Sequence, residues 1–387
     1  MPTLYRPSAT GARAGGRLLA SAHLVLLAVA LAPLFLVEIP ALVDYPNHLA
    51  RMHILAELDG SPELQAIYAA NWAVLPNLAM DAVVPWLGRV VGVTMAGKLF
   101  IALTLVLLVA GTLALARVLH GRLGAGSLAV YLVLYNYVLS FGFLNYLFGV
   151  GLGLLLLAFW IGARNRPVWL RLALATVGVA ALFFSHLGAV ATYALCVAGY
   201  ELWTWSRTPP RRLTVLLRRA ALAGAPLLPA AALFALLSPT PMAETGVVYL
   251  FAQKAIAPLV PMLFYEQATD IYLMAGFFCL LAVALAGRLL SIQPAVVLPA
   301  LGLAAAVLLV PNWIFGNWGN DFRLVVPLVL VLIAGLGIKP GRGKALAAVG
   351  LAALALFAVR VGTLTQDWLA YDRLYDELRT AAREIEP

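Results

Sequence analysis

The sequence predicts an all-α protein, a bundle of about 11 transmembrane helices. Two observations carry this prediction. First, 63% of the 387 residues are hydrophobic and only 11% are charged. Second, apolar stretches of about 20 residues, the length that a helix needs to cross a bilayer, recur along the whole chain. A net charge of +9 could suggest nucleic-acid binding in a water-soluble protein. Here most of the basic residues lie in short connectors between apolar stretches, so we expect membrane lipids and no nucleic acid as partners.

Hydropathy places the predicted spans one after another. They begin near residues 18, 97, 125, 146, 168, 187, 215, 271, 294, 322 and 345. The first, 18–37, is too long for the apolar core of a secretory signal and lacks a small-residue cleavage site, so we expect it to be retained as a helix. The last, 345–361, is short and rich in alanine. Whether it crosses decides the side on which the C-terminal segment lies.

The charges of the connectors predict an orientation. Short connectors after alternate spans hold most of the 26 lysines and arginines, and such connectors lie on the cytoplasmic side. This places the N-terminus in the cytoplasm and the chain in a plasma (inner) membrane. The opposite connectors are longer and more polar or aromatic, above all 38–96, 239–270 and 311–323. We therefore expect the functional site on the outer face, or periplasmic side.

The sequence divides into a membrane domain, 1–361, and a short appendage, 362–387. The first outer loop of the membrane domain, 38–96, is far longer than a link between neighbouring helices requires. It contains amphipathic stretches that can lie flat at a membrane surface. The appendage has the pattern of a charged amphipathic helix.

Ionisable residues gather where the first outer loop begins, in the stretch ALVDYPNHLARMH. Pro46 suits the first turn of a helix and disfavours helical geometry at Tyr45, so a helix should start there with Asp44 just before it. Two interpretations of Asp44 stay open. It either stabilises the start of this helix or acts as a general base beside a substrate path.

The two histidines of this stretch are not expected to form a metal-binding pair. His48 and Arg51 are three residues apart and share one face of the predicted helix, whereas His53 points away from His48. The alternative role for Arg51 is to anchor the helix at lipid headgroups. Cys196 and Cys279 lie inside apolar stretches, where packing is the expected role of a cysteine.

The layout resembles the GT-C superfamily of integral membrane glycosyltransferases. A hydrophobic first helix, an outer loop with an early aspartate, amphipathic interfacial helices and a bundle of further spans carry this resemblance. It implies that the donor is a sugar linked to a polyprenyl phosphate and that an early acidic residue is the catalytic base. The matching residue in VDYPNHLAR is Asp44. The acceptor, a glycan, a lipid or a protein, stays open.

The chain departs from the metal-dependent members of that superfamily. Many of them have a paired-acid or Asp-x-Asp signature in the first outer loop, but Asp44 is followed by Tyr45 and Pro46, and the next acidic residue is Glu57. The sequence therefore requires no cofactor and assigns no metal ligand. Whether the chain uses a divalent metal stays open.

A lipid-linked donor implies cations beside its phosphate, because negative charge develops on the leaving group. Arg323 is the first candidate for this contact, and Arg51 and Lys254 are further candidates. Contacts to the rest of the substrates are expected from His48, His186, Glu266, Asn320 and Asp321.

Two other classes of protein stay open as alternatives. A transporter of lipids or solutes, or a flippase, would line a path with the same charges. Such a protein needs polar groups near the bilayer midplane, whereas the ionisable residues here gather near the outer ends of the spans. The other alternative is a catalytically silent subunit of a membrane complex. Signatures of soluble nucleotide-binding enzymes and of serine hydrolases are not found in the sequence.

Overall fold

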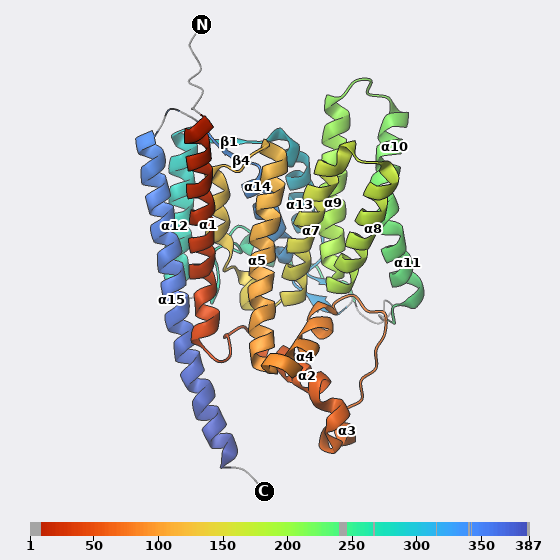
Figure 1. The fold of residues 1–387 in the computed structure, drawn as a ribbon, viewed down its shortest axis with the longest axis vertical. Coiled ribbons are helices and arrows are strands. Elements are labelled where there is room, and N and C mark those ends of the chain that lie inside the picture. Colours follow the sequence, from red (N-terminus) through yellow and green to blue (C-terminus); the bar gives the residue numbers. More distant parts are fainter. Residues whose placement is uncertain are drawn as a thin grey trace.

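A computed structural model describes residues 9–239, 246–265, 268–314, 316–339, 341 and 343–384. Helices make up 78% of the structure, and the strands among the described residues form two antiparallel pairs. The predicted all-α class is therefore confirmed. Most of the long helices run along a common direction, and the short helices between residues 45 and 91 lie at one end of the bundle (Figure 1).

The bundle is built from α1 (Ala9–Leu36), α5 (Val93–His120), α7 (Leu144–Gly162), α8 (Val168–Ser185), α9 (Leu187–Arg207), α10 (Leu213–Gly224), α11 (Leu228–Leu237), α12 (Ala268–Ala286), α13 (Val297–Leu309), α14 (Val325–Ala334) and α15 (Gly343–Arg383). The short helices are α2 (Tyr45–Glu57), α3 (Pro62–Ile67), α4 (Ala79–Val91) and α6 (Tyr137–Ser140). The strand pairs are β1 (Leu290–Ile292) with β4 (Leu336–Ile338), and β2 (Trp313–Ile314) with β3 (Asn317–Trp318). Two 3₁₀ segments matter below, η2 (Ala125–Val133) and η7 (Phe322–Leu324).

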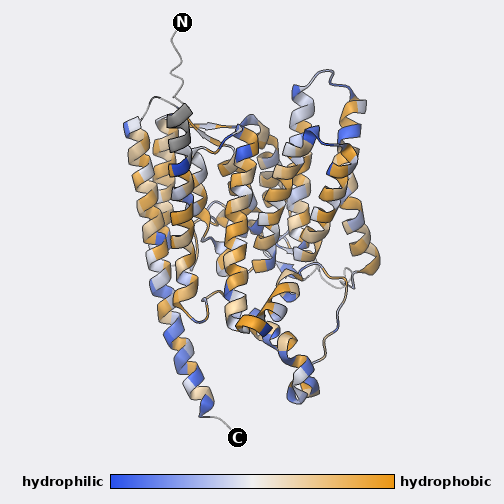
Figure 2. Ribbon diagram, viewed as in Figure 1, coloured by the Kyte–Doolittle hydropathy of each residue, from blue (hydrophilic) through white to orange (hydrophobic). Residues whose placement is uncertain are grey.

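Seven helices of the described residues, not 11, are long and apolar enough to cross a membrane. They are Gly15–Leu36, Val93–His120, Leu144–Asn165, Val168–Ser185, Leu213–Leu237, Ala268–Ala286 and Gly343–Arg383. Hydrophobic residues dominate along these helices, and hydrophilic residues gather near the ends of the bundle (Figure 2). The chain is therefore a helical membrane protein.

The other four predicted spans differ for local reasons. Those expected near residues 125, 294 and 322 are shorter apolar helices. In the first of them, the side chain of Asn136 accepts a hydrogen bond from the Leu139 amide and separates η2 from α6. The fourth, α9, has 21 residues but includes polar ones such as Glu201, which lowers its hydropathy.

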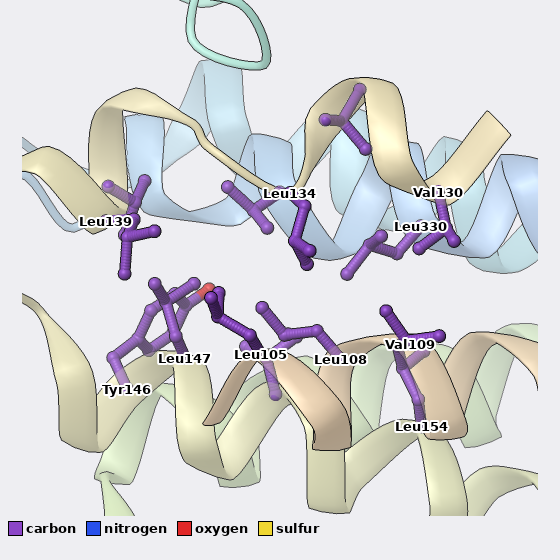
Figure 3. Packing of buried hydrophobic residues seen from close by; sticks show 14 of the residues in the cluster. Leu105, Leu108, Val109, Val130, Leu134, Leu139, Tyr146, Leu147, Leu154 and Leu330 are labelled. Carbon is purple, nitrogen blue, oxygen red and sulfur yellow. The ribbon is translucent and has the colours of Figure 1, made fainter. Parts of the chain in front are cut away.

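The centre of the bundle is the packing of α5 against α7. A side chain at Gly111 would come within 2.6 Å of the Gly151 carbonyl oxygen, and one at Gly151 would come within 2.7 Å of the Leu107 backbone. Small residues of this kind let helix backbones approach closely in a membrane. On the other side of α5 lie η2 and α14. The core residues labelled in Figure 3 are Leu105, Leu108, Val109, Val130, Leu134, Leu139, Tyr146, Leu147, Leu154 and Leu330.

The last helix, α15, continues without a break through residue 361, where the membrane domain was predicted to end. Its hydrophilic C-terminal part extends beyond the bundle, at the end where α2, α3 and α4 lie (Figures 1 and 2). There the Asp372 carboxylate accepts hydrogen bonds from the amides of Glu38, at 2.9 Å, and Ile39, at 3.4 Å. Arg379 forms an ion pair with Glu38 at 2.6 Å. The C-terminal part of α15 therefore holds the segment that leads from α1 towards α2.

Candidate functional site

A cavity of about 130 Å³ lies between the first long loop and the bundle. Its lining residues include the acidic Asp44, the histidines His48 and His186, and the basic Arg323. Four of the described helices begin at its walls: α2 after Asp44, α4 at Ala79, α7 at Leu144 and α9 after His186. Helix starts carry partial positive charge on their free N–H groups, so the backbone around this cavity favours an anion.

Asp44 is fixed through its backbone and not through its carboxylate. Its amide donates to the Phe141 carbonyl at 3.0 Å, and the Val43 amide donates to the Ser140 carbonyl at 2.9 Å. Its side chain makes no capping hydrogen bond to α2, although the helix begins where Pro46 predicted. Among the described residues, none donates a hydrogen bond to this carboxylate. The carboxylate is therefore available to a substrate in the cavity.

Gly142 makes this docking possible. Its φ is +81°, a backbone conformation that other residues adopt only under strain, and an added Cβ would lie 3.3 Å from both the amide nitrogen and the Cβ of Asp44. The turn between α6 and α7 can approach Asp44 closely because a glycine occupies this position.

Gly142→Ala is expected to lower the unfolding free energy by about 1–3 kcal/mol, because alanine is strained at this φ, and to push the Asp44 segment away from the turn. Thermal unfolding of the purified protein measures the loss. Gly60→Ala is the matched control, since a side chain at Gly60 meets nothing within 4 Å. Equal losses in the two variants would contradict the role given to Gly142.

His48 and Arg51 lie on α2 as their spacing predicted, but they have different surroundings. His48 lines the cavity. Burial, and then the charge of Arg51, lower the pKa of His48, so the ring is neutral near pH 7. Arg51 is paired with Asp81 at 2.8 Å. Arg51 does not line the cavity. The structure therefore does not place Arg51 where it would contact a donor phosphate bound in this cavity.

Asp81, in the first turn of α4, was not singled out from the sequence. Its side chain is buried, and burial raises its pKa although Arg51 opposes the rise. Asp81 also lies close enough to His48 to influence the pKa of that ring. The sequence signal was an acidic residue at the start of the amphipathic stretch DAVVPWLGRVVG.

Arg323, in η7, is buried, with a relative exposure of 6%. One terminal nitrogen, Nη2, donates to the Trp318 carbonyl, and the guanidinium carbon lies 3.7 Å from the centre of the Phe143 ring. The other terminal nitrogen, Nη1, lies 3.4 Å from Nε2 of His186. The Nε–H group is buried and has no partner among the described residues. Arg323 therefore brings a positive charge and free donors to the cavity.

Lys254, Asn320 and Asp321 do not line the cavity. The Lys254 ammonium donates to the carbonyls of Val307 and Val310 at 3.0 and 2.7 Å and pairs with Asp321 at 3.1 Å. Three oxygens therefore surround this predicted phosphate ligand. Asn320 donates to the Asn317 carbonyl at 2.6 Å. Glu266 lies outside the described residues.

Two asparagines form a wall of the cavity that the sequence did not predict. The Asn145 side chain accepts from the Met80 amide at 2.8 Å and donates to the Asn77 carbonyl at 3.0 Å. Asn77 has a φ of +103°, which is uncommon outside glycine. Asn145 thus fixes the segment before α4 against α7. The signal available in the sequence was an asparagine within the otherwise largely apolar stretch FLNYLF.

Across the ranges that the structure describes, no group of three or more His, Cys, Asp or Glu residues could hold a metal ion. Comparison of the chain with protein-family models, with curated proteins and with solved structures found no match. The fold and the site therefore define the class, a helical membrane protein with a polar, partly charged cavity at one end. That cavity is the feature of the structure that points to a function.

Proposed function

We propose that the chain is a membrane glycosyltransferase, similar in layout to the GT-C superfamily, that moves a sugar from a polyprenyl-phosphate donor to an acceptor. One observation supports this most. Asp44 and Arg323, which lie far apart in the sequence, line the same cavity. A transferase of this kind needs both a base for the acceptor and a cation for the leaving phosphate.

In the proposed reaction, Asp44 takes the proton of an acceptor hydroxyl while its oxygen attacks the anomeric carbon of the sugar. The bond between that carbon and the phosphate oxygen breaks on the opposite face, so the anomeric configuration inverts. The electron pair stays on the phosphate, and Arg323 stabilises the charge. The carboxylate of Asp44, which makes no capping hydrogen bond, and the unpartnered Nε–H group of Arg323 support these two roles.

The experiment that tests the proposal is sugar transfer by purified protein, with a labelled polyprenyl-phosphate sugar as donor and a panel of hydroxyl acceptors. We expect a glycosidic product of inverted configuration, read by NMR. If the protein binds the lipid phosphate and moves it across vesicles without forming a product, the transporter alternative replaces the transferase. If it does neither, the silent-subunit alternative is favoured.

The proposal also places the cavity on the outer face of a plasma membrane. In a Cys279→Ser background, a cysteine at Gly60 should react with an impermeant thiol reagent added to intact cells. A cysteine at Thr208, in the basic connector after α9, should react only after the cells are opened. Both positions are exposed, so the reagent can reach them. The reverse pattern would exclude an outward-facing site.

A further inference from the structure

The position of His186 determines which of its ring nitrogens carries the proton. His186 precedes α9, and its Nδ1 accepts a hydrogen bond from the Gly188 amide at 2.9 Å. An imidazole nitrogen that accepts a hydrogen bond has no proton. Burial, and then the charge of Arg323, lower the pKa of His186 to about 3, so the ring is neutral. The single ring proton must therefore be on Nε2.

This proton makes the contact with Arg323 unusual. Nε2 of His186 lies 3.4 Å from Nη1 of Arg323, and an arginine nitrogen is always a donor. Two N–H groups face each other and cannot form a hydrogen bond. The opposite tautomer would relieve this contact, but it would set a ring N–H against the Gly188 amide at 2.9 Å. The shorter contact decides between the two tautomers.

Unsatisfied donors therefore gather at one place. They are the Nε2–H of His186 and the Nη1–H of Arg323, and the buried Nε–H of Arg323 is close by without a partner. Both residues line the cavity. Buried donors are normally satisfied, so this arrangement lacks an acceptor. A single oxygen between the two side chains would satisfy them.

We propose that His186 and Arg323 together hold one oxygen of a phosphate group, with His186 serving as a neutral Nε2–H donor whose tautomer is fixed by the start of α9. This inference rests on the proposed function, since it assigns the phosphate to the lipid-linked donor. Neutral His186 adds a second directed donor without a second charge. Arg323, whose charge also interacts with that of Asp44 across the cavity, then supplies the positive charge beside the phosphate.

Two variants of His186 separate its roles. His186→Asn keeps an acceptor for the Gly188 amide, because asparagine is a good residue at a helix start, but its side chain is too short to donate at the Nε2 position. His186→Gln places an amide N–H near that position and gives up the cap. We expect His186→Asn to weaken phosphate binding by about 10-fold or more at an unchanged unfolding temperature. His186→Gln should bind within a few-fold of the wild type and unfold at a lower temperature.

The binding probes are farnesyl phosphate, farnesol and inorganic phosphate, titrated into the purified full chain. The wild type should bind farnesyl phosphate more tightly than farnesol, and His186→Asn should reduce this difference. An equal loss for inorganic phosphate would support a contact to the phosphate whatever its source. If His186→Asn binds farnesyl phosphate as the wild type does, the role of His186 is refuted. If the wild type binds no phosphate, both this role and the proposed donor site fail.

Tautomer and activity give independent tests. In ¹⁵N-histidine-labelled protein, the signals missing from His186→Asn should report a proton on Nε2 and none on Nδ1, and the opposite assignment would overturn the inference. If the binding results are as expected but the wild type transfers no sugar to any acceptor, the phosphate site is supported and the transferase proposal fails. The two proposals can therefore fail separately.

Discussion

Asp44→Asn should lower the rate of sugar transfer by about 10²- to 10⁴-fold, the range typical of a lost general base. Asparagine has nearly the shape of aspartate but cannot take a proton from the acceptor. The variant should fold normally, because the native contacts of Asp44 are made by its backbone, whose N–H group donates a hydrogen bond to the Phe141 carbonyl at 3.0 Å. The measurement is transfer from a labelled polyprenyl-phosphate sugar, together with thermal unfolding.

Asp44→Glu refines this test. Glutamate keeps the charge but moves the carboxylate by one methylene, and a misplacement of about 1 Å can reduce a rate on the order of 100-fold. An exposed residue of the same loop, Asp59, provides the control: its side chain is 91% exposed, and Asp59→Asn should leave transfer unchanged. A stable Asp44→Asn variant with full activity would remove Asp44 from catalysis and most of the support for an enzyme.

Arg323→Ala is expected to weaken the binding of farnesyl phosphate strongly and to lower transfer by about 10²- to 10³-fold, the loss seen when one donor to a developing negative charge is removed. Arg323→Lys should restore only part of the function, because lysine keeps the charge but loses the planar fork of donors. The buried position over the Phe143 ring, 3.7 Å from its centre, also suits a flat guanidinium better than an ammonium group.

Arg89→Ala is the matched control for this substitution. Arg89 is on α4, in the same loop region as the site, but its side chain is 42% exposed and its ion pair with Asp59 spans 3.6 Å at the surface. Surface pairs of this kind contribute little, so binding and transfer should not change. Unchanged farnesyl phosphate binding in Arg323→Ala, at a normal unfolding temperature, would refute the phosphate site.

The class of the fold could be predicted from the sequence because hydrophobic length is a direct physical requirement of a bilayer. The number of crossing helices could not. Hydropathy averages over a stretch and does not report where a helix stops, as Asn136 shows by dividing one apolar run into η2 and α6. The continuity of α15 could not be anticipated either, because Gly362 stands where the sequence changes from apolar to charged, and a glycine is common just after the end of a helix.

Only part of the site could be predicted from the sequence. The part that could not be predicted depends on contacts between segments that are far apart in the chain. Asp44 and His48 could be placed relative to one another because both belong to one helix start, and they line the cavity. The pairing of Arg51 with Asp81, and of Lys254 with Asp321, depends on tertiary contacts between distant segments. No local pattern encodes such partners. From the sequence, Arg51 and Lys254 could therefore be proposed as phosphate ligands only from their positions in the outer loops.

The contacts of α15 with the first loop also affect how the protein is made. The segment that leads to Asp44 is held by Asp372 and Arg379, and the Trp368 indole donates at 2.6 Å to Tyr265, whose hydroxyl donates to the Ala41 carbonyl. A ribosome therefore has to reach α15 before the segment ahead of Asp44 acquires these contacts. Nascent chains that stop before α15 would hold this segment only through earlier contacts, such as the hydrogen bond from the Asp44 amide to the Phe141 carbonyl.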